Sequence, residues 1–451
     1  MPNTVRFNED YPSISKSDEY YARALNLIPA ATQTLAKGPG QYVRGVAPKY
    51  IQRGKGSHVW DVDGNEYIDF TMGVGPVSLG YCYDRVDEAI KAQLEDGITF
   101  SLMHPLEVEV AELLRDILPQ AEMIRFSKTG ADVTSAAVRL ARAYTNRDKV
   151  LCCGYHGWHD WYIGASSRND GVPQVVRDLT NIFDYNDLQS VVDLIDKDTA
   201  CIILEPTIFE SPKHNFLWDL KVICEQNGTL LVFDEMWTGF RLALGGAQEF
   251  FGITADLACY SKAVANGMPL SILAGRREVM ELCESDVFFF TTFGGEALSL
   301  AAAKATIEEL RDKKVSDYIA KLGRVLKDGY NALAHELGMN FTACSGFDCR
   351  TVVTFNPPAG NPLELKSLLQ QEMIKRGVLW NGFHNLSFSH SHQDIAYTLN
   401  AYRDSLPIVK RALESNEVRN YLQGEPVEPV FRPTLRFTPK PEPKASNAVR
   451  A

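Results

Sequence analysis

Short apolar runs alternate with amphipathic stretches between about residues 105 and 330. The strand-like runs are residues 123–126, 149–153, 199–204, 229–233 and 257–260. The helical stretches include residues 106–118, 133–144 and 298–313. Strands that are covered on both faces are apolar throughout, whereas strands with one solvated face alternate. The pattern therefore predicts an α/β protein with a mostly parallel sheet between layers of helices.

The segments before and after this region lack the alternation of strand-like and helical stretches. Many Pro and Gly residues punctuate the N-terminal segment after a helical stretch at 20–27, and HVWDVDGNEYIDF predicts a hairpin with a tight turn at Asp63-Gly64. Six prolines fall between Pro426 and Pro443. We predict four parts: an N-terminal arm with the hairpin (residues 1–70), a large domain (71–330), a smaller α+β lobe (331–423) and an extended or disordered tail (424–451).

Composition narrows the class of protein. The 451 residues carry 46 Lys and Arg against 57 Asp and Glu, a formal net charge of -11. Nucleic acids and anionic membranes attract the opposite charge, so neither is expected as a partner. The nine cysteines form no Cys-x-x-Cys pair, and no apolar run approaches the length of a membrane span. With no apolar signal region near the N-terminus, we expect a cytoplasmic protein.

Ligands bind at the carboxyl ends of parallel strands, so we examined the residues that end each run. Thr129, Gly130 and Ala131 follow the first run and precede a helix. The free N–H groups at the start of that helix favour a phosphate by about 0.3–1 kcal/mol. An alternative is that Thr129 is only a helix cap and Gly130 a turn residue.

Two later runs end in ionisable residues. Asp234 and Glu235 follow one run, and the strand period places them on opposite faces, with Met236 on the face of Asp234. A buried Asp234 needs a helix terminus, a magnesium ion or a protonated ring nitrogen as its partner. Another run ends just before Lys262. Burial there would lower the pKa of the amine and make it a nucleophile, although most lysines are solvated surface groups.

An anion cradle, a strand-end carboxylate and a strand-end lysine are together the three parts that bind pyridoxal 5'-phosphate (PLP). Tyr155 follows a further run, where its ring can stack on a planar cofactor. Thr291 and Thr292 offer hydroxyl groups for a second phosphate contact. The sequence therefore predicts a PLP site.

These residues lie in a chain that resembles the class III aminotransferases of PLP fold type I, from about Trp60 to about Leu413. Within the class it is most similar to the glutamate-1-semialdehyde 2,1-aminomutase-like branch. The matching stretches are WDVDGNEYIDF, RLARAYTNRDK, GYHGWHD, LLVFDEMWTGFR, GAQEFFGITADL, Ser261-Lys262 and GGEALSLAAAKATIEEL. Their order and spacing are specific, although each stretch alone is weak.

The resemblance implies a role for each matching residue. Lys262 would form the Schiff base with PLP and move the substrate proton, while Asp234 would keep the pyridine nitrogen protonated. Thr292 would reach the phosphate of a neighbouring subunit, which makes a homodimer with shared active sites. The other implied cofactor contacts are Thr129, Gly130 and Ala131 at the phosphate, Tyr155 and Met236 on the two ring faces, and His156 behind the ring. Glu205 also matches a position of the family and is a candidate substrate contact.

Departures from the aminomutase pattern fall on the substrate side. The arm reads PAATQTLA at 29–36 where aminomutases have Gly-Gly-Val-Asn-Ser-Pro-Val-Arg, Val74 replaces a tryptophan, and Glu296 lies where an asparagine is usual. We therefore expect an aminotransferase that moves an amino group from an amino-acid donor to an aldehyde or ketone by a ping-pong mechanism. The alternative is an intramolecular aminomutase. Glu296, His384 and Asn385 are either substrate contacts or loop residues near the entrance.

Two further interpretations are weaker. Histidines and aspartates at 156–160 and 390–394 have short spacings that suit zinc, but neither set lies on one helical face, so no catalytic metal is expected. A non-enzymatic partner protein of the same fold is the remaining alternative. The presence of both Lys262 and Asp234 argues against it.

Overall fold

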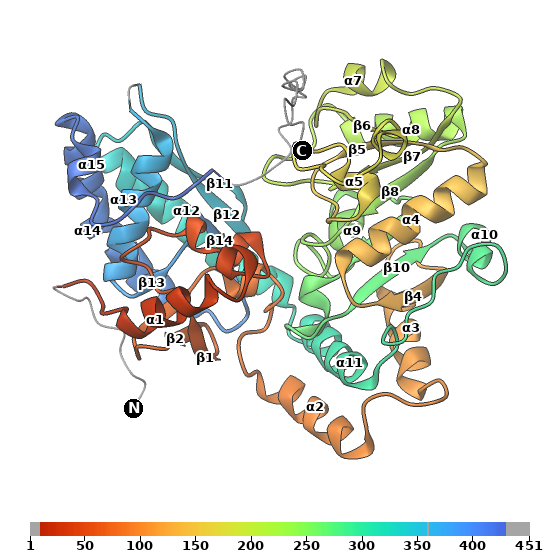
Figure 1. The fold of residues 1–451 in the computed structure, drawn as a ribbon, viewed down its shortest axis with the longest axis horizontal. Helices are drawn as coiled ribbons and strands as arrows, with labels where there is room; N and C mark the ends of the chain where they lie inside the picture. Colours follow the sequence, from red (N-terminus) through yellow and green to blue (C-terminus); the bar gives the residue numbers. More distant parts are fainter. Residues whose placement is uncertain (1–9, 359, 430–451) are drawn as a thin grey trace, which may run out of the picture.

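The computed structural model describes residues 10–358 and 360–429. In Figure 1 the large sheet and the helices around it lie on the right, and the N-terminal arm lies with the C-terminal segment on the left. The helices that pack around the large sheet, or connect its strands, are α2 (Asp84–Asp96), α3 (Pro105–Ile117), α4 (Gly130–Thr145), α5 (Asp160–Ile163), α6 (Gln174–Arg177), α7 (Leu188–Val192), α8 (Phe216–Asn227), α9 (Gly246–Phe251), α10 (Arg277–Met280) and α11 (Ala297–Asp312).

The large sheet has seven strands in the order β4-β10-β9-β8-β7-β5-β6. Their bounds are β4 Met123–Ser127, β5 Lys149–Cys153, β6 Thr180–Ile182, β7 Thr199–Leu204, β8 Leu230–Asp234, β9 Leu257–Tyr260 and β10 Ser271–Gly275. β10 runs antiparallel to both of its neighbours, and the pairs from β9 to β6 are parallel. The predicted α/β fold with a mostly parallel sheet is confirmed, although β6 and β10 were not predicted.

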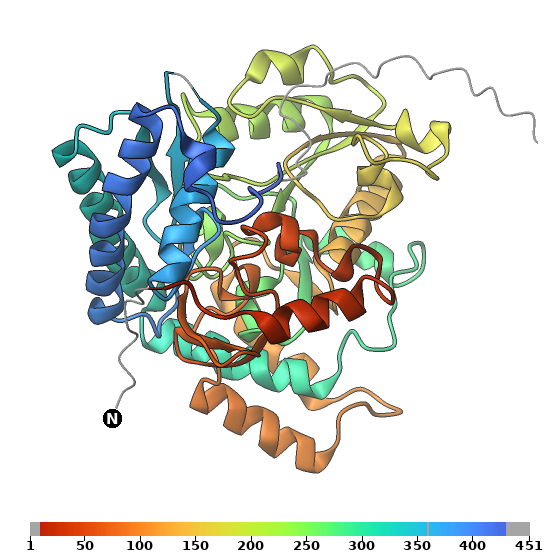
Figure 2. The same cartoon turned by 60° about the vertical axis from the view of Figure 1, so that its left-hand side comes forward.

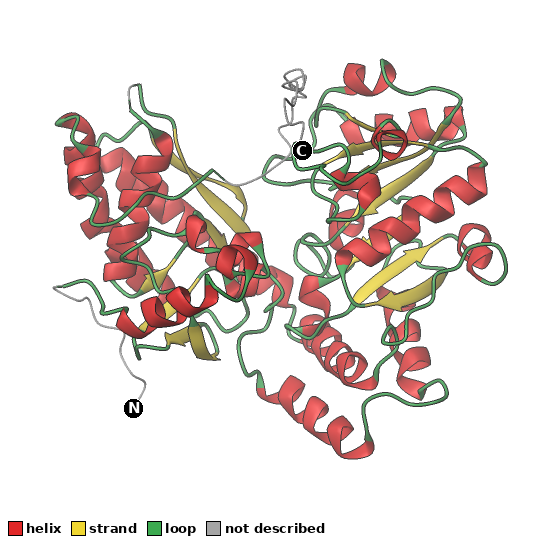
Figure 3. Cartoon of the chain, viewed as in Figure 1, coloured by secondary structure: helices red, strands yellow, loops and turns green. Residues whose placement is uncertain are grey.

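Both faces of this sheet are buried, which explains the uninterrupted apolar runs. In β7, Cys201 and Ile203 pack into one apolar cluster with α4, and Ile202 and Leu204 pack into another with α8. A strand whose successive side chains enter two different cores has no polar face. Figure 3 shows the helices on either side of the strands.

The predicted hairpin is present, but its turn is wider than expected. β2 (His58–Asp61) pairs antiparallel with β3 (Glu66–Asp69), and Trp60 lies opposite Glu66. The Asp61 carboxylate accepts the N–H groups of Asp63 and Asn65 at 3.0 and 2.8 Å. This side chain therefore organises a longer loop, in which Gly64 supplies the positive φ of 93°.

The C-terminal segment completes the N-terminal hairpin. β13 (Val378–Leu379) pairs in parallel with β3, in a sheet of order β1-β2-β3-β13 that begins with β1 (Ile51–Lys55). A second sheet, β11-β12-β14, lies nearby. Figure 2 shows the N-terminal helix α1, in red, at the front of the molecule next to the hairpin. The remaining bounds are α1 Ser15–Ala24, β11 Thr342–Phe347, β12 Arg350–Phe355, β14 Phe383–Asn385, α12 Val315–Glu336, α13 Pro362–Lys375, α14 His392–Glu414 and α15 Val418–Tyr421.

The last described residues run along the arm in an extended form. Glu425 forms an antiparallel bridge with Arg44, and the Glu428 N–H donates to the Gly40 carbonyl at 2.7 Å. The rest of the predicted tail, from residue 430, lies outside the described residues. Within residues 10–358 and 360–429, no helix combines the length and the apolar character that crossing a bilayer would require.

Candidate active site

A buried carboxylate ends the central strand of the large sheet. Asp234 is the last residue of β8 and is 1% exposed. Its Oδ2 lies 2.8 Å from Nδ1 of His156, and its Oδ1 accepts the Met236 N–H at 3.0 Å. The other ring nitrogen of His156 lies 3.1 Å from the Cys153 carbonyl, which only accepts, so Nε2 is the donor there. The Cys153 carbonyl thus holds the His156 ring through Nε2, and the ring contacts Asp234 through Nδ1.

The neighbouring Glu235 has a separate structural role, as the strand period predicts. Its carboxylate accepts the N–H groups of Ala247 and Gln248 at 2.7 and 3.0 Å, at the start of α9. Burial raises the pKa of Glu235 to about 7, against the opposing effect of these hydrogen bonds. Of the two adjacent carboxylates, Asp234 therefore faces the candidate site, whereas Glu235 anchors the start of α9.

Lys262 follows β9 in a strained backbone conformation. Its φ of 46° lies in the left-handed region, which costs a residue with a Cβ about 1–2 kcal/mol. Burial and the Arg350 guanidinium lower the pKa of its amine, although the carboxylates of Glu205 and Asp234 oppose the shift. A lowered pKa increases the neutral fraction of the amine, which is the nucleophilic form.

An anion cradle lies at the start of α4. The Thr129 hydroxyl accepts the Asp132 N–H at 3.3 Å, and the Thr129 N–H donates to the Asp132 carboxylate at 2.8 Å. Thr129 is therefore the N-cap of α4. Among the described residues, the N–H groups of Gly130 and Ala131 have no acceptor. A Cβ on Gly130 would lie 2.8 Å from Sδ of Met236, so a larger residue here would require the Met236 side chain to shift.

Tyr155 and Glu205 lie at the next two strand ends. The Tyr155 side chain is half exposed, and its N–H donates to Oε1 of Glu205 at 2.9 Å. Burial and the nearby Asp234 carboxylate raise the pKa of Glu205. Gly154 has a φ of 109°, and a Cβ there would lie 2.8 Å from the same Glu205 oxygen. The structure therefore brings Tyr155, Glu205, Asp234 and Lys262 to one edge of the sheet.

These residues fit PLP. A nucleophilic amine, a buried carboxylate held by His156, and helix N–H groups without acceptors among the described residues match the aldehyde, the ring nitrogen and the phosphate of that cofactor.

Two predicted substrate contacts have other roles. Glu296 caps α11, accepting the N–H groups of Leu298 and Ser299 at 2.9 and 3.0 Å, and pairs with Lys128 at 2.7 Å. His384 is fully buried, with ring nitrogens 2.8 Å from the Thr351 hydroxyl and 2.7 Å from the Tyr402 hydroxyl. Burial lowers the pKa of His384 to about 3. The expectation that His384 contacts substrate is wrong, because both nitrogens are engaged inside the C-terminal lobe.

Sequence reasoning did not identify the role of Arg241. This buried side chain donates to the Leu386 carbonyl at 2.9 Å and to the Gly75 carbonyl at 2.6 Å. A Cβ on Gly75 would lie 3.9 Å from Cδ of Lys262. Arg241 therefore holds the loop that forms one wall of the lysine site. The sequence did contain a signal for this role. Arg241 ends the largely apolar stretch LLVFDEMWTGFR, and a charged side chain among buried residues needs hydrogen-bond partners.

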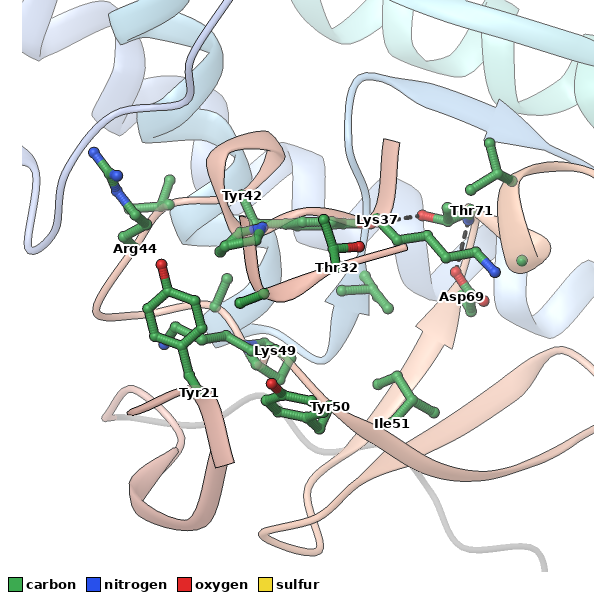
Figure 4. Close-up of a pocket in the computed structure, with 18 of the residues that line it drawn as sticks. Tyr21, Thr32, Lys37, Tyr42, Arg44, Lys49, Tyr50, Ile51, Asp69 and Thr71 are labelled. Atoms are coloured by element: carbon green, nitrogen blue, oxygen red, sulfur yellow. Dashed lines mark hydrogen bonds between the residues drawn. The ribbon is translucent and has the colours of Figure 1, made fainter. Parts of the chain in front are cut away.

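A cavity of about 410 Å³ lies between the arm and the segment from Asp69 to Val74. Figure 4 shows the Lys37 side chain extending toward Asp69, with Tyr21, Tyr42 and Tyr50 around the space. Ala31, Thr32 and Val74 also line it. Lys262 does not line this arm pocket, but Val74 does, and the next residue, Gly75, is the one that lies against Lys262.

The predicted metal spacings do not form a site in the part of the chain that the structure describes. No three His, Cys, Asp or Glu side chains gather there as metal ligands. The Asp394 carboxylate instead accepts from the Ser57 hydroxyl and lies close to His58.

The sheet and the residues at its edge define a PLP-dependent enzyme of fold type I. The family model Aminotransferase class-III matches residues 42–343, and the chain belongs to this family. A relative from Cloacimonas acidaminovorans, "3-aminobutyryl-CoA aminotransferase", is 34% identical over 415 residues, covering 89% of this chain and 99% of the relative. A "Glutamate-1-semialdehyde 2,1-aminomutase" from Persephonella marina is 33% identical, covering 85% and 98%.

Solved structures agree with the fold. The PLP internal aldimine form of the Sphingopyxis sp. MTA144 FumI protein superposes with a TM-score of 0.83 at 28% identity, covering 89% of this chain and 98% of that one. The cofactor of this enzyme is PLP, as the residues and the family agree.

Proposed function

We propose that this enzyme transfers an amino group between two separate substrates, from an amino-acid donor to an aldehyde or ketone acceptor, in a ping-pong cycle. The observation that supports this proposal is the position of the departures from the aminomutase pattern. Ala31, Thr32 and Val74 differ from that pattern, and all three line the arm pocket beside the lysine site. The chain thus retains the residues that fit the cofactor and changes the walls that a substrate would meet.

The residues divide the chemistry between them. PLP, when bound, withdraws electrons from the substrate carbon that carries the amine. Lys262 would hold the cofactor covalently, and its free amine would take and return the proton at that carbon. Asp234, fixed by His156, keeps the ring nitrogen protonated. Gly130, Ala131 and Thr129 bind the phosphate at the start of α4.

The test is a half-reaction with a panel of amino acids. Purified enzyme loaded with PLP is mixed with each candidate donor, and loss of the visible absorbance of the lysine-bound cofactor is followed together with release of a 2-oxo acid. A productive donor converts the cofactor to its amine form without any acceptor present. If no donor does so, the proposal is wrong.

Intramolecular transfer is the second candidate, because many relatives of similar identity carry the aminomutase name. An aminomutase rearranges a single amino-carbonyl substrate and releases no oxo acid from an external donor. Incubating the enzyme with glutamate and an acceptor, and then assaying 2-oxoglutarate, distinguishes the two reactions.

We further propose a homodimer with shared active sites. Thr292 lies on an exposed loop that carries Phe288, 74% exposed, and it is close in the chain to Phe290 and Phe293. This loop is joined to a second exposed apolar loop by the hydrogen bond from the Ala297 N–H to the Ile98 carbonyl; Leu102 and Met103 there are 80% and 81% exposed. Apolar patches of this kind mark contact surfaces. A partner subunit on this face would bring its own Thr292 to the PLP phosphate.

A cytoplasmic location is also part of the proposal. All nine cysteines are free thiols, and eight of them are buried. Such thiols persist in a reducing compartment.

A further inference from the structure

One ion pair joins the N-termini of two helices of the large domain, α4 and α11. Lys128 precedes Thr129, the cap of α4, and Glu296 is the cap of α11. Nζ of Lys128 lies 2.7 Å from Oε1 of Glu296. The same Glu296 oxygen accepts the Ser299 N–H at 3.0 Å. The ion pair therefore ties the start of the helix that forms the anion cradle to the start of α11.

The chain that leads to Glu296 is attached to the strand and the helix on either side of the cradle. We call residues 288–296 the threonine loop, because they include Thr292. Arg139 in α4 donates to the Phe288 carbonyl at 2.8 Å. Cζ of Arg125 in β4 lies 4.3 Å from the ring centroid of Phe290. The first half of the threonine loop is thus held by β4 and α4.

The second half of the threonine loop also packs on β4. A Cβ on Gly294 would lie 2.7 Å from the carbonyl oxygen of Phe126, so the two backbones approach closely there. Thr292, two residues earlier, is exposed. Contacts with the cradle elements therefore hold both halves of the loop, whereas Thr292 is accessible to a neighbouring subunit.

The Lys128–Glu296 ion pair is largely withdrawn from solvent, with side chains 19% and 10% exposed. Burial lowers the pKa of Lys128, although Glu296 opposes the shift. Burial would raise the pKa of Glu296, but hydrogen bonds from Lys128 and Ser299 outweigh it and lower the pKa. The loss of hydration and the gain from pairing thus oppose each other. Such a pair adds little to the stability of a fold, but it can specify one arrangement of the elements that carry it.

The pair carries no net charge, so it is a weak attractor for a phosphate by itself. We propose that the Lys128–Glu296 ion pair fixes the threonine loop relative to the cradle of its own chain, and that this position brings Thr292 to the PLP phosphate of the neighbouring subunit. Lys128 and Glu296 are positioning residues, which act on the phosphate through Thr292. This inference rests on the shared active sites proposed above. Cofactor affinity at one site then depends on an ion pair in the partner subunit.

The experiment measures how tightly the full-length enzyme rebinds PLP after the cofactor has been removed. Equilibrium dialysis compares the wild type with Lys128→Met, Lys128→Arg and Glu296→Gln, and pyridoxal, which lacks the phosphate, is the matched ligand. We expect Lys128→Met and Glu296→Gln each to weaken PLP binding by about 3- to 30-fold and to leave pyridoxal binding unchanged. Lys128→Arg keeps a cation that can reach Glu296, so it retains most of the affinity. Equal losses for PLP and pyridoxal would show a merely structural role and overturn the inference.

Glu296→Gln separates positioning from simple charge attraction. This variant keeps a side-chain oxygen for the start of α11 and removes a negative charge beside the cradle. Charge attraction alone would then tighten PLP binding, whereas a displaced threonine loop weakens it. Tighter or unchanged binding overturns the inference. The matched control is Lys304→Met, which removes an ion pair of the same 2.7 Å length between α11 and Glu109 of α3 and should leave both ligands unaffected. A similar loss in this control would also overturn the inference.

The double variant Lys128→Met with Thr292→Val tests whether the ion pair acts through the threonine. If it does, the double variant binds PLP about as weakly as Thr292→Val alone, because the same contact is already lost. Additive losses overturn this inference and leave the shared site intact. If Thr292→Val itself leaves PLP binding unchanged, the shared site and this inference both fail. Thermal unfolding midpoints check that each cofactor-free variant is folded, and Glu296→Gln takes the place of Lys128→Met in the double variant if the latter does not fold.

Discussion

At the scale of single residues, the pairing of Asp234 with His156 explains how a carboxylate stays in place inside the sheet. One oxygen of Asp234 contacts Nδ1 of His156, and the other accepts the N–H of Met236, two residues further along the chain. His156 comes from the end of a different strand, so the pair depends on the sheet order. The arrangement holds the carboxylate in one orientation, as contact with a protonated ring nitrogen requires.

We predict that Asp234→Asn lowers kcat by about 10²- to 10³-fold, because a neutral amide of the same shape cannot stabilise the positive ring nitrogen. Single-turnover kinetics with the best donor measure the effect. Bound PLP, quantified after dialysis, serves as the control for cofactor retention. Unchanged kcat in enzyme that retains PLP would contradict the role given to Asp234.

A second residue-scale prediction concerns the contact between Gly130 and Met236. Gly130→Ala places a Cβ 2.8 Å from Sδ of Met236 and pushes that side chain toward the space the ring needs. We expect weaker PLP binding, measured by equilibrium dialysis. The double variant Gly130→Ala with Met236→Ala should recover part of the affinity, because the smaller side chain relieves the overlap. Additive losses would show that the two residues do not meet.

At the scale of elements, one histidine links the hairpin to a helix of the C-terminal lobe. His58 in β2 lies 2.9 Å from the Glu66 carboxylate and 3.2 Å from the Asp394 carboxylate in α14. Burial alone would lower the pKa of His58, but the two carboxylates outweigh it and raise the pKa. Conversely, His58 and the Ser391 N–H outweigh burial and hold the pKa of Asp394 at about 2.

His58→Ala should therefore destabilise the fold in a pH-dependent way. A raised folded pKa stabilises the protein below the unfolded pKa of histidine, about 6.5, and this contribution disappears as the pH rises through the folded value. We expect a loss of about 1–3 kcal/mol near pH 6 and a smaller loss near pH 9. Thermal unfolding midpoints at the two pH values measure it. The exposed His335→Ala is the matched control.

Element positions were more predictable than the contacts between elements. The apolar runs gave β5, β7 and β9 with the observed bounds, because strands buried on both faces have no polar interruption. β6 was missed because only three residues form it, including a polar Asn181. Partners such as His156 for Asp234, or Glu296 for Lys128, join segments far apart in the chain, and periodicity carries no information about them. His384 was misjudged because its burial depends on α14 packing over β14.

At the scale of the whole molecule, shared active sites can be tested by mixing inactive chains. Lys262→Ala lacks the reacting lysine, and Thr292→Val lacks the proposed contact to the partner's phosphate. In a mixed dimer with shared sites, one site receives both wild-type residues. Co-expression in equal amounts should restore about a quarter of the wild-type activity at limiting PLP, since about half of the dimers are mixed and each has one intact site. Activity no higher than that of the Thr292→Val chains alone would contradict sharing.

The parallel pairing of β3 with β13 also determines when, during translation, the N-terminal sheet can be completed. Ile68 pairs with Val378, so the edge of the hairpin stays open until the ribosome has added the 310 residues from position 69 to position 378. At about 5–20 residues per second, that interval lasts about 15–60 s. The large sheet, complete at Gly275, has all its strands well before then. The nascent chain therefore carries an exposed strand edge for most of its translation, and such an edge can pair with a strand of another chain.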